Sequence, residues 1–122
     1  MDFDSLIAEL GRNIGLEDLA FENDGTCSVF FDEDEVFFEK HGGKLLFIAP
    51  LGSAEGKEDL YRTVLEANFL GGDAALGAIG IDPDQDGFVL SRVLEGDEDY
   101  EDFERSLLLF IRCLRKWKPV SL

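Results

Sequence analysis

The chain has 122 residues, of which 27 are acidic and 11 basic, so its formal net charge is −16 and its isoelectric point about 4.2. A surface this acidic repels the phosphates of nucleic acids and anionic lipids, which argues against both as partners and favours the binding of proteins. The length suits one domain, residues 1–122, and no apolar run approaches the length of a membrane span. Since the acidic N-terminus lacks the pattern of a signal peptide, we expect a cytoplasmic protein.

The first predicted elements are one helix and three strands. In residues 2–13 the apolar side chains recur at helical spacing, and Gly15 is placed to end the helix. Strand-like runs follow at residues 27–31, 36–40 and 44–51, separated by acidic and glycine-rich turns. The glycine pair after the second run suits a tight hairpin. An antiparallel meander is therefore expected.

The second half of the chain continues with a helix, two strands and a last helix. These are predicted over residues 57–69, 74–81, 88–94 and 98–117. The last helix begins with acidic residues and ends with basic ones, which complements the helix dipole. The order α-β-β-β-α-β-β-α predicts an α+β fold in which three helices pack on a five-stranded, mainly antiparallel sheet.

Few residues could carry catalysis or hold a metal. Residues 82–87 (Asp-Pro-Asp-Gln-Asp-Gly) match the start of a calcium loop, but Val93 stands where that motif requires Glu, and strands flank it. A hairpin turn explains these residues better, with a calcium sensor as the other interpretation. His41, the single histidine, lies in a glycine turn, and Cys27 and Cys113 lie in apolar patterns typical of buried thiols. We predict no enzyme, no cofactor and no metal.

The strands carry apolar side chains on both faces. Successive side chains of a strand point to opposite faces, so Phe30 and Phe31 face opposite ways, as do Phe37 and Phe38. Two interpretations stay open. Either the helices wrap a twisted sheet completely, or some of these residues form an exposed groove that another polypeptide covers. The small residues of 72–81 likewise suit close packing against a second copy or within one monomer.

Three stretches of the chain carry a family resemblance. Residues 65–71 (Leu-Glu-Ala-Asn-Phe-Leu-Gly), followed by residues 76–83 (Leu-Gly-Ala-Ile-Gly-Ile-Asp-Pro), form one compact signature. Residues 6–11 with the Gly-Leu pair at 15–16 form an opening helix and turn, and the last helix ends in Trp117. In order and spacing these resemble the Tir-chaperone family, the class I chaperones of bacterial type III secretion, over nearly the whole chain.

The resemblance implies a homodimer joined through the second helix and the strand after it, with no nucleotide use. It implies that the chain binds the N-terminal segment of a secreted effector and keeps it unfolded and secretion-competent. Carried over, the effector-binding residues are Leu6, Leu10, Val29, Phe31, Phe37 and Phe47, with the outward member of each Phe doublet left open. The dimer-interface residues are Leu60, Val64, Asn68, Leu76 and Ala78. The alternative is an acidic interaction module on the same fold, such as a regulator or toxin-neutralising partner.

Overall fold

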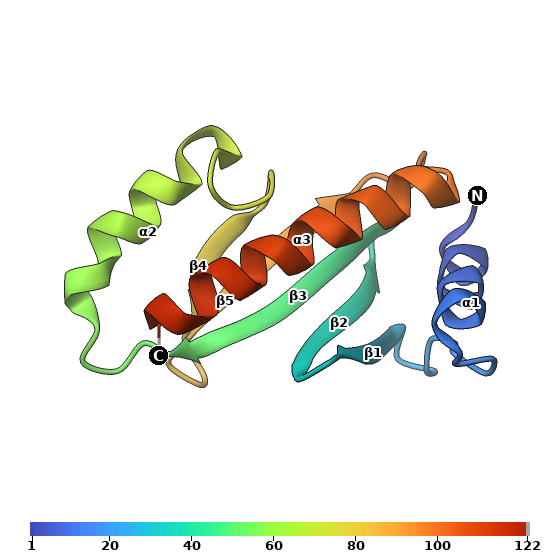
Figure 1. Ribbon diagram of the computed structural model, residues 1–122, viewed down its shortest axis with the longest axis horizontal. Helices are drawn as coiled ribbons and strands as arrows, with labels where there is room; N and C mark the ends of the chain where they lie inside the picture. The colour runs from blue at the N-terminus through green and yellow to red at the C-terminus, as the bar shows by residue number, and fades with distance from the viewer. Residues whose placement is uncertain (122) are drawn as a thin grey trace.

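A computed structural model describes the backbone of residues 1–121 and the side chains of residues 1–118 (Figure 1). Its elements are α1 (Phe3–Ile14), β1 (Thr26–Phe31), β2 (Asp34–His41), β3 (Lys44–Ser53), η1 (Glu58–Leu60), α2 (Tyr61–Asn68), η2 (Phe69–Gly71), β4 (Ala78–Asp82), β5 (Gly87–Leu94) and α3 (Tyr100–Ser121). Here η denotes a single 3-10 turn. The predicted order and the α+β class are confirmed.

The five strands form one antiparallel sheet in the order β1-β2-β3-β5-β4. β1 to β3 form the predicted meander, and its first turn contains only Asp32 and Glu33. Asp32 has a φ of 59°, the left-handed conformation that tight hairpins require. β1 and β4 are the two edges of the sheet.

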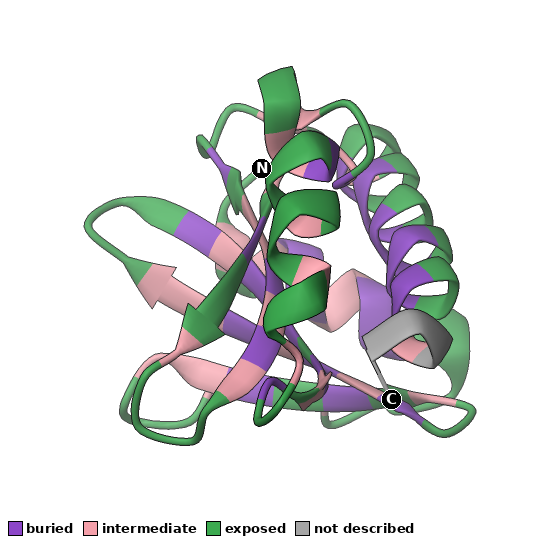
Figure 2. Cartoon of the chain, turned by 90° about the vertical axis from the view of Figure 1, so that its left-hand side faces the viewer, coloured by how far each residue is buried: buried purple, intermediate pink, exposed green. Residues whose placement is uncertain are grey.

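All three α-helices lie on one side of the sheet. α3 crosses β3 and β5, α1 lies beside it near one end, and α2 lies against β4 (Figure 1). Figure 2 shows buried residues along the side of α3 that faces the sheet, whereas α2 is largely exposed. An aromatic cluster fills the centre of this layer: the ring centroids of Phe47 lie 5.4 Å from Phe38, 5.7 Å from Phe103 and 5.5 Å from Phe110. All three contacts are T-shaped, and those with Phe103 and Phe110 join the sheet to α3.

The ends of α1 follow the sequence pattern. The Asp2 carboxylate accepts a hydrogen bond from the Ser5 N–H at 2.7 Å, which caps the first turn. Gly15, at a φ of 83°, ends the helix as predicted.

The segment between α2 and β4 differs from the prediction. A strand was expected over residues 74–81, but β4 begins only at Ala78. Ala75 and Leu76 have φ values of 53° and 63°. This left-handed backbone conformation is incompatible with a β-strand, so the two residues form a turn instead. The reason is tertiary: the Asp73 carbonyl accepts hydrogen bonds from Trp117 Nε1 at 2.8 Å and Cys113 Sγ at 3.5 Å, which hold the segment against α3.

Candidate functional site

The side of the sheet opposite the helices carries an apolar strip. We call it the outer face, defined by Phe37, Leu46, Ile48, Pro50, Val89 and Val93. Register places these side chains together, because Ile48 pairs with Phe37 on one side and Pro50 pairs with Val89 on the other. Each of the six is exposed or partly exposed. Of the two interpretations left open by the sequence, the structure supports the exposed groove.

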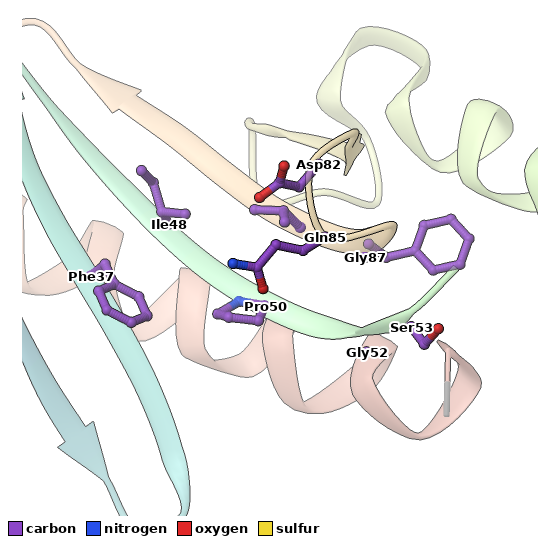
Figure 3. A pocket seen from close by; sticks show the side chains of 10 residues that line it. Phe37, Ile48, Pro50, Gly52, Ser53, Asp82, Gln85 and Gly87 are labelled. Atoms are coloured by element: carbon purple, nitrogen blue, oxygen red, sulfur yellow. The ribbon is translucent and has the colours of Figure 1, made fainter. Parts of the chain in front are cut away.

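The outer face is hollowed near the end of β3. The hollow has a volume of about 480 Å³. It is lined by Phe37, Ile48, Pro50, Gly52, Ser53, Asp82, Gln85, Gly87, Phe88 and Val89. Figure 3 shows these residues coming from neighbouring strands and from the β4–β5 turn, with α3 behind the sheet. The arrangement can accept apolar side chains of another polypeptide.

Acidic residues border the hollow. Glu35 and Glu39 flank Phe37 at alternate positions of β2, so they lie on the same face, and Asp82 lines the hollow from β4. None of these three carboxylates forms an ion pair within the described residues. The apolar hollow therefore lies between unneutralised negative charges.

β1 is a free sheet edge beside the outer face. The Gly25 carbonyl accepts from the Lys40 N–H at 2.9 Å, whereas the Thr26 carbonyl accepts from the Glu22 N–H at 2.8 Å, away from β2. Since this pattern alternates along an antiparallel pair, Ser28 and Phe30 also point their backbone groups away from β2. No partner for those outward groups lies in the part of the chain that the structure describes. A peptide in extended form can add to such an edge as a sixth strand.

At the other edge, a side chain covers the backbone of one residue of β4. Asn68 donates from Nδ2 to the Ile79 carbonyl and accepts at Oδ1 from the Ile79 N–H, both at 2.8 Å. The amide thus satisfies both outward backbone groups of Ile79 on β4. This contact gives Asn68, predicted as a dimer residue, a role within the monomer as well.

Four of the predicted effector-binding residues lie in the hydrophobic core. Leu6, Leu10, Val29 and Phe47 are at most 3% exposed. The α1 and strand positions that they occupy face the helix layer, so these side chains offer no surface to a partner in this structure. In this structure the exposed apolar side chains lie on the other face of the same sheet, and a role of these four residues in effector binding stays a prediction.

The Phe doublets are resolved by the direction of each side chain. Phe37 lies on the outer face as expected, while Phe38 is fully buried. In the first doublet Phe30 is 65% exposed, whereas the predicted Phe31 is partly buried against the core. Phe30 was not among the predicted residues. The sequence shows that Phe30 and Phe31 face opposite sides of the sheet, but it does not show which side the helices cover.

A second exposed apolar surface lies on α2 and the segments around it. Its exposed members are Tyr61, Leu65, Phe69, Leu70, Leu76 and Ile81. Leu70 is 85% exposed and Leu65 70%. Between α2 and β4 lies a hollow of about 290 Å³, lined by Tyr61, Val64, Leu65, Ile79, Gly80, Ile81 and Phe88. Of the predicted dimer residues, Leu76 and Ala78 are exposed here, while Leu60 and Val64 are partly buried.

The chemically reactive groups are not assembled into a site. His41 is exposed, and burial raises the pKa of the Cys27 thiol to about 11. Strands flank the turn of residues 82–87, and the Asp82 carboxylate accepts from the Asp84 N–H at 2.9 Å, as in a hairpin turn. No three His, Cys, Asp or Glu side chains converge on a metal position within the described residues. Over the same residues, no helix combines the length and apolar character that a membrane crossing requires.

The apolar sheet face, the open edge strand and the separate apolar helix surface are features that suit contact with other polypeptides. The sequence pattern of the Tir chaperone protein (CesT) family matches residues 5–118, so the chain belongs to this family of secretion chaperones.

Solved structures show the same fold. A chain in the crystal structure of the ExsC–ExsE complex has a TM-score of 0.82 at 23% identity and covers 99% of this chain and 97% of its own length. A chain of the HopA1–SchA chaperone–effector complex has a TM-score of 0.78 at 18% identity, with coverage of 96% and 93%. For the ExoU–SpcU complex from the type III secretion system of Pseudomonas aeruginosa the TM-score is 0.75 at 20% identity, with coverage of 98% and 97%. No curated protein sequence gives a significant match.

Proposed function

We propose that this protein, a type III secretion chaperone by its family, binds the N-terminal segment of a secreted effector in the bacterial cytoplasm and keeps it extended. The observation that carries the proposal is the apolar outer face, which no helix covers and which ends at the free edge of β1. Similar folds occur in structures described as a chaperone–effector complex and as a secretion-chaperone complex, which supports the same use here.

Backbone hydrogen bonds at β1 would bind the effector segment, here called the client, independently of its amino-acid sequence. Ser28 and Phe30 each offer one N–H and one C=O along the free edge. Each hydrogen bond formed there contributes about 0.5–1.5 kcal/mol net. Ordering each client residue costs about 1–2 kcal/mol of backbone entropy, so pairing alone cannot retain the segment.

Apolar contact supplies the remaining stabilisation. Phe30 lies on the exposed side of β1, and the hollow of the outer face begins on the neighbouring strand, at Phe37 of β2. Burial of apolar area stabilises by about 25 cal/mol per Å². A client that spans both places gains contact and pairing together. It remains unfolded because its apolar side chains are occupied by the chaperone and cannot form a core.

We further propose a homodimer formed through α2 and β4. The exposed Leu65, Phe69, Leu70 and Leu76 form an apolar surface that has no cover in the monomer. An apolar surface of this kind on a highly charged protein is typical of a subunit interface. The predicted dimer residues Leu60, Val64, Asn68, Leu76 and Ala78 lie on or beside it.

The test combines capture of the client with a matched pair of variants. The tagged protein is purified from secreting cells of the source bacterium, and the retained protein is identified by mass spectrometry and digested by limited proteolysis. We expect one larger secreted protein, protected only over an N-terminal stretch. Phe30→Asp should abolish its retention with little change in melting temperature, because the Phe30 side chain is 65% exposed.

Phe31→Asp is the comparison within the same doublet. Phe31 packs against the core, so this variant should lose thermal stability and client together. Retention of the client by Phe30→Asp, or protection of a compact folded domain instead of an N-terminal stretch, would overturn the proposal.

A further inference from the structure

We infer that the outer face selects client segments in which Lys or Arg residues flank the apolar ones. This inference rests on the proposed function and specifies its substrate class. It is carried by the position of the acidic residues around the hollow, by the absence of neutralising partners for them, and by the shortage of basic residues on this face.

The carboxylates lie where the flanks of a bound segment would pass. On β2, Glu35 and Glu39 stand on either side of Phe37, which lines the hollow. On the opposite side of the hollow, Asp82 contributes to its wall. All three are partly buried already, so a segment laid across the hollow would remove more of the water around them.

Basic residues of the protein are committed elsewhere. Lys40 pairs with Asp4 at 3.0 Å, and Arg115 and Lys118 pair with Asp34 at 3.0 and 2.9 Å. Lys118 also lines a neighbouring hollow with Phe30 and Glu35, but its ammonium group is held by Asp34. Lys44, the one Lys or Arg with outer-face parity on the described strands, lies at the far end of β3 and pairs with Glu95 at 3.1 Å. Among the described residues that line the hollow, none is Lys or Arg.

Charge then discriminates between clients. A carboxylate that loses water without gaining a partner opposes binding, whereas one that meets Lys or Arg forms a charge-assisted hydrogen bond. The long stem of Lys or Arg can lie along Phe37 while its charged end reaches Glu35 or Glu39. An acidic segment would be repelled at the hollow and by the net charge of −16. A second copy of this chain would meet the same repulsion, which argues against it as the occupant.

Three labelled peptides test the inference on the intact protein. Each peptide has 15 residues and the same pattern of Leu and Ile. The peptides differ only in the residues that flank the apolar ones, which are Lys in the first peptide, Gln in the second and Glu in the third. Fluorescence anisotropy at low and high salt gives each dissociation constant. We expect the Lys peptide to bind about tenfold more tightly than the Gln peptide, the Glu peptide to bind least, and the difference to shrink in high salt.

Charge-neutral variants assign the effect to the outer face. Glu35→Gln combined with Glu39→Gln should remove the preference for Lys, and the Gln peptide should bind more tightly than to the unchanged protein, because its binding no longer strips water from unpaired carboxylates. Glu17→Gln combined with Asp18→Asn removes equal charge from an exposed loop and should leave the preference intact. Equal binding of all three peptides would overturn charge selection and leave apolar capture standing. Failure of all three to bind would overturn capture at the outer face as well.

Discussion

Neighbouring phenylalanines have opposite roles in this sheet. Phe38 is fully buried and contacts Phe47 edge to face, while Phe37 lines the hollow on the other side of the same strand. Phe30 and Phe31 are divided in the same way. Substitutions within one doublet therefore separate stability from binding with the smallest change in position.

The two thiols belong to the stable interior. Burial, aided by the charge of Glu22, raises the pKa of Cys27 to about 11, and burial with the charge of Asp73 raises that of Cys113. We expect neither to react with iodoacetamide at about pH 8 in the native protein, because the thiolate is the reactive form. Mass spectrometry should show two alkylated cysteines in guanidinium and none without it. Rapid native labelling of Cys27 would contradict its burial.

At the scale of elements, one end of α3 holds the first hairpin in place. Arg115 donates to the carboxylates of Asp34 and Asp32, both at 3.0 Å, and to the Phe31 carbonyl at 3.2 Å. Lys118 donates to Asp34 at 2.9 Å. The side chain of Asp34 is only 12% exposed, so its charge depends on these two cations. The connection fixes the β1–β2 turn, and with it the free edge, relative to the helix layer.

This connection should make stability depend on acid. Hydrogen bonds from Lys118 and then Arg115 hold the pKa of the Asp34 carboxyl below its ordinary value. Its contribution is therefore complete above the unfolded-state pKa of about 4 and is lost as the pH falls through the lower folded-state pKa. We expect Asp34→Asn to lower the free energy of unfolding by about 1–2 kcal/mol at pH 7, measured by urea denaturation.

The loss should shrink towards pH 2, where Asp34 of the unchanged protein is also protonated. Asp97→Asn removes an exposed carboxylate as the matched control and should change the unfolding free energy little at either pH. An Asp34→Asn variant as stable as the original at pH 7 would show that the connection to α3 does not stabilise the hairpin.

For the whole molecule, the apolar surface of α2 predicts the state of association. We expect light scattering to give twice the 13.6 kDa of one chain, and Leu65→Asp with Leu70→Asp to give the single-chain mass with native circular dichroism. Leu108→Asp, at a half-exposed position of α3, is the control and should remain dimeric. A double variant that stays dimeric would place the interface elsewhere.

Much of this fold could be predicted from periodicity and turn chemistry. Apolar spacing located α1, β1 to β3, β5 and α3, and Gly15 marked the end of α1. The sequence could not reveal the left-handed turn at Ala75 and Leu76, since bulky side chains rarely adopt it and contacts of Asp73 with α3 impose it.

The exposure of the predicted site residues could not be foreseen, for a related reason. Apolar character at Leu6, Val29 and Phe47 is required equally by a core and by a binding groove, so sequence alone does not separate them. Burial decides, and burial depends on which face the helices cover. The Phe doublets did carry usable information, because they predicted that both faces of the sheet are apolar.

The acidic turn between β1 and β2 has a consequence for the empty chaperone. An open strand edge beside apolar side chains is the usual starting point of self-pairing and fibre growth. Here Glu33 and Glu35, which form no ion pair within the described residues, lie at the end of that edge, and two copies paired in parallel along it would bring these carboxylates together. Repulsion of this kind acts as a gatekeeper against aggregation. The edge of β1 can thus stay available for the client without pairing with the same edge of another copy of the protein.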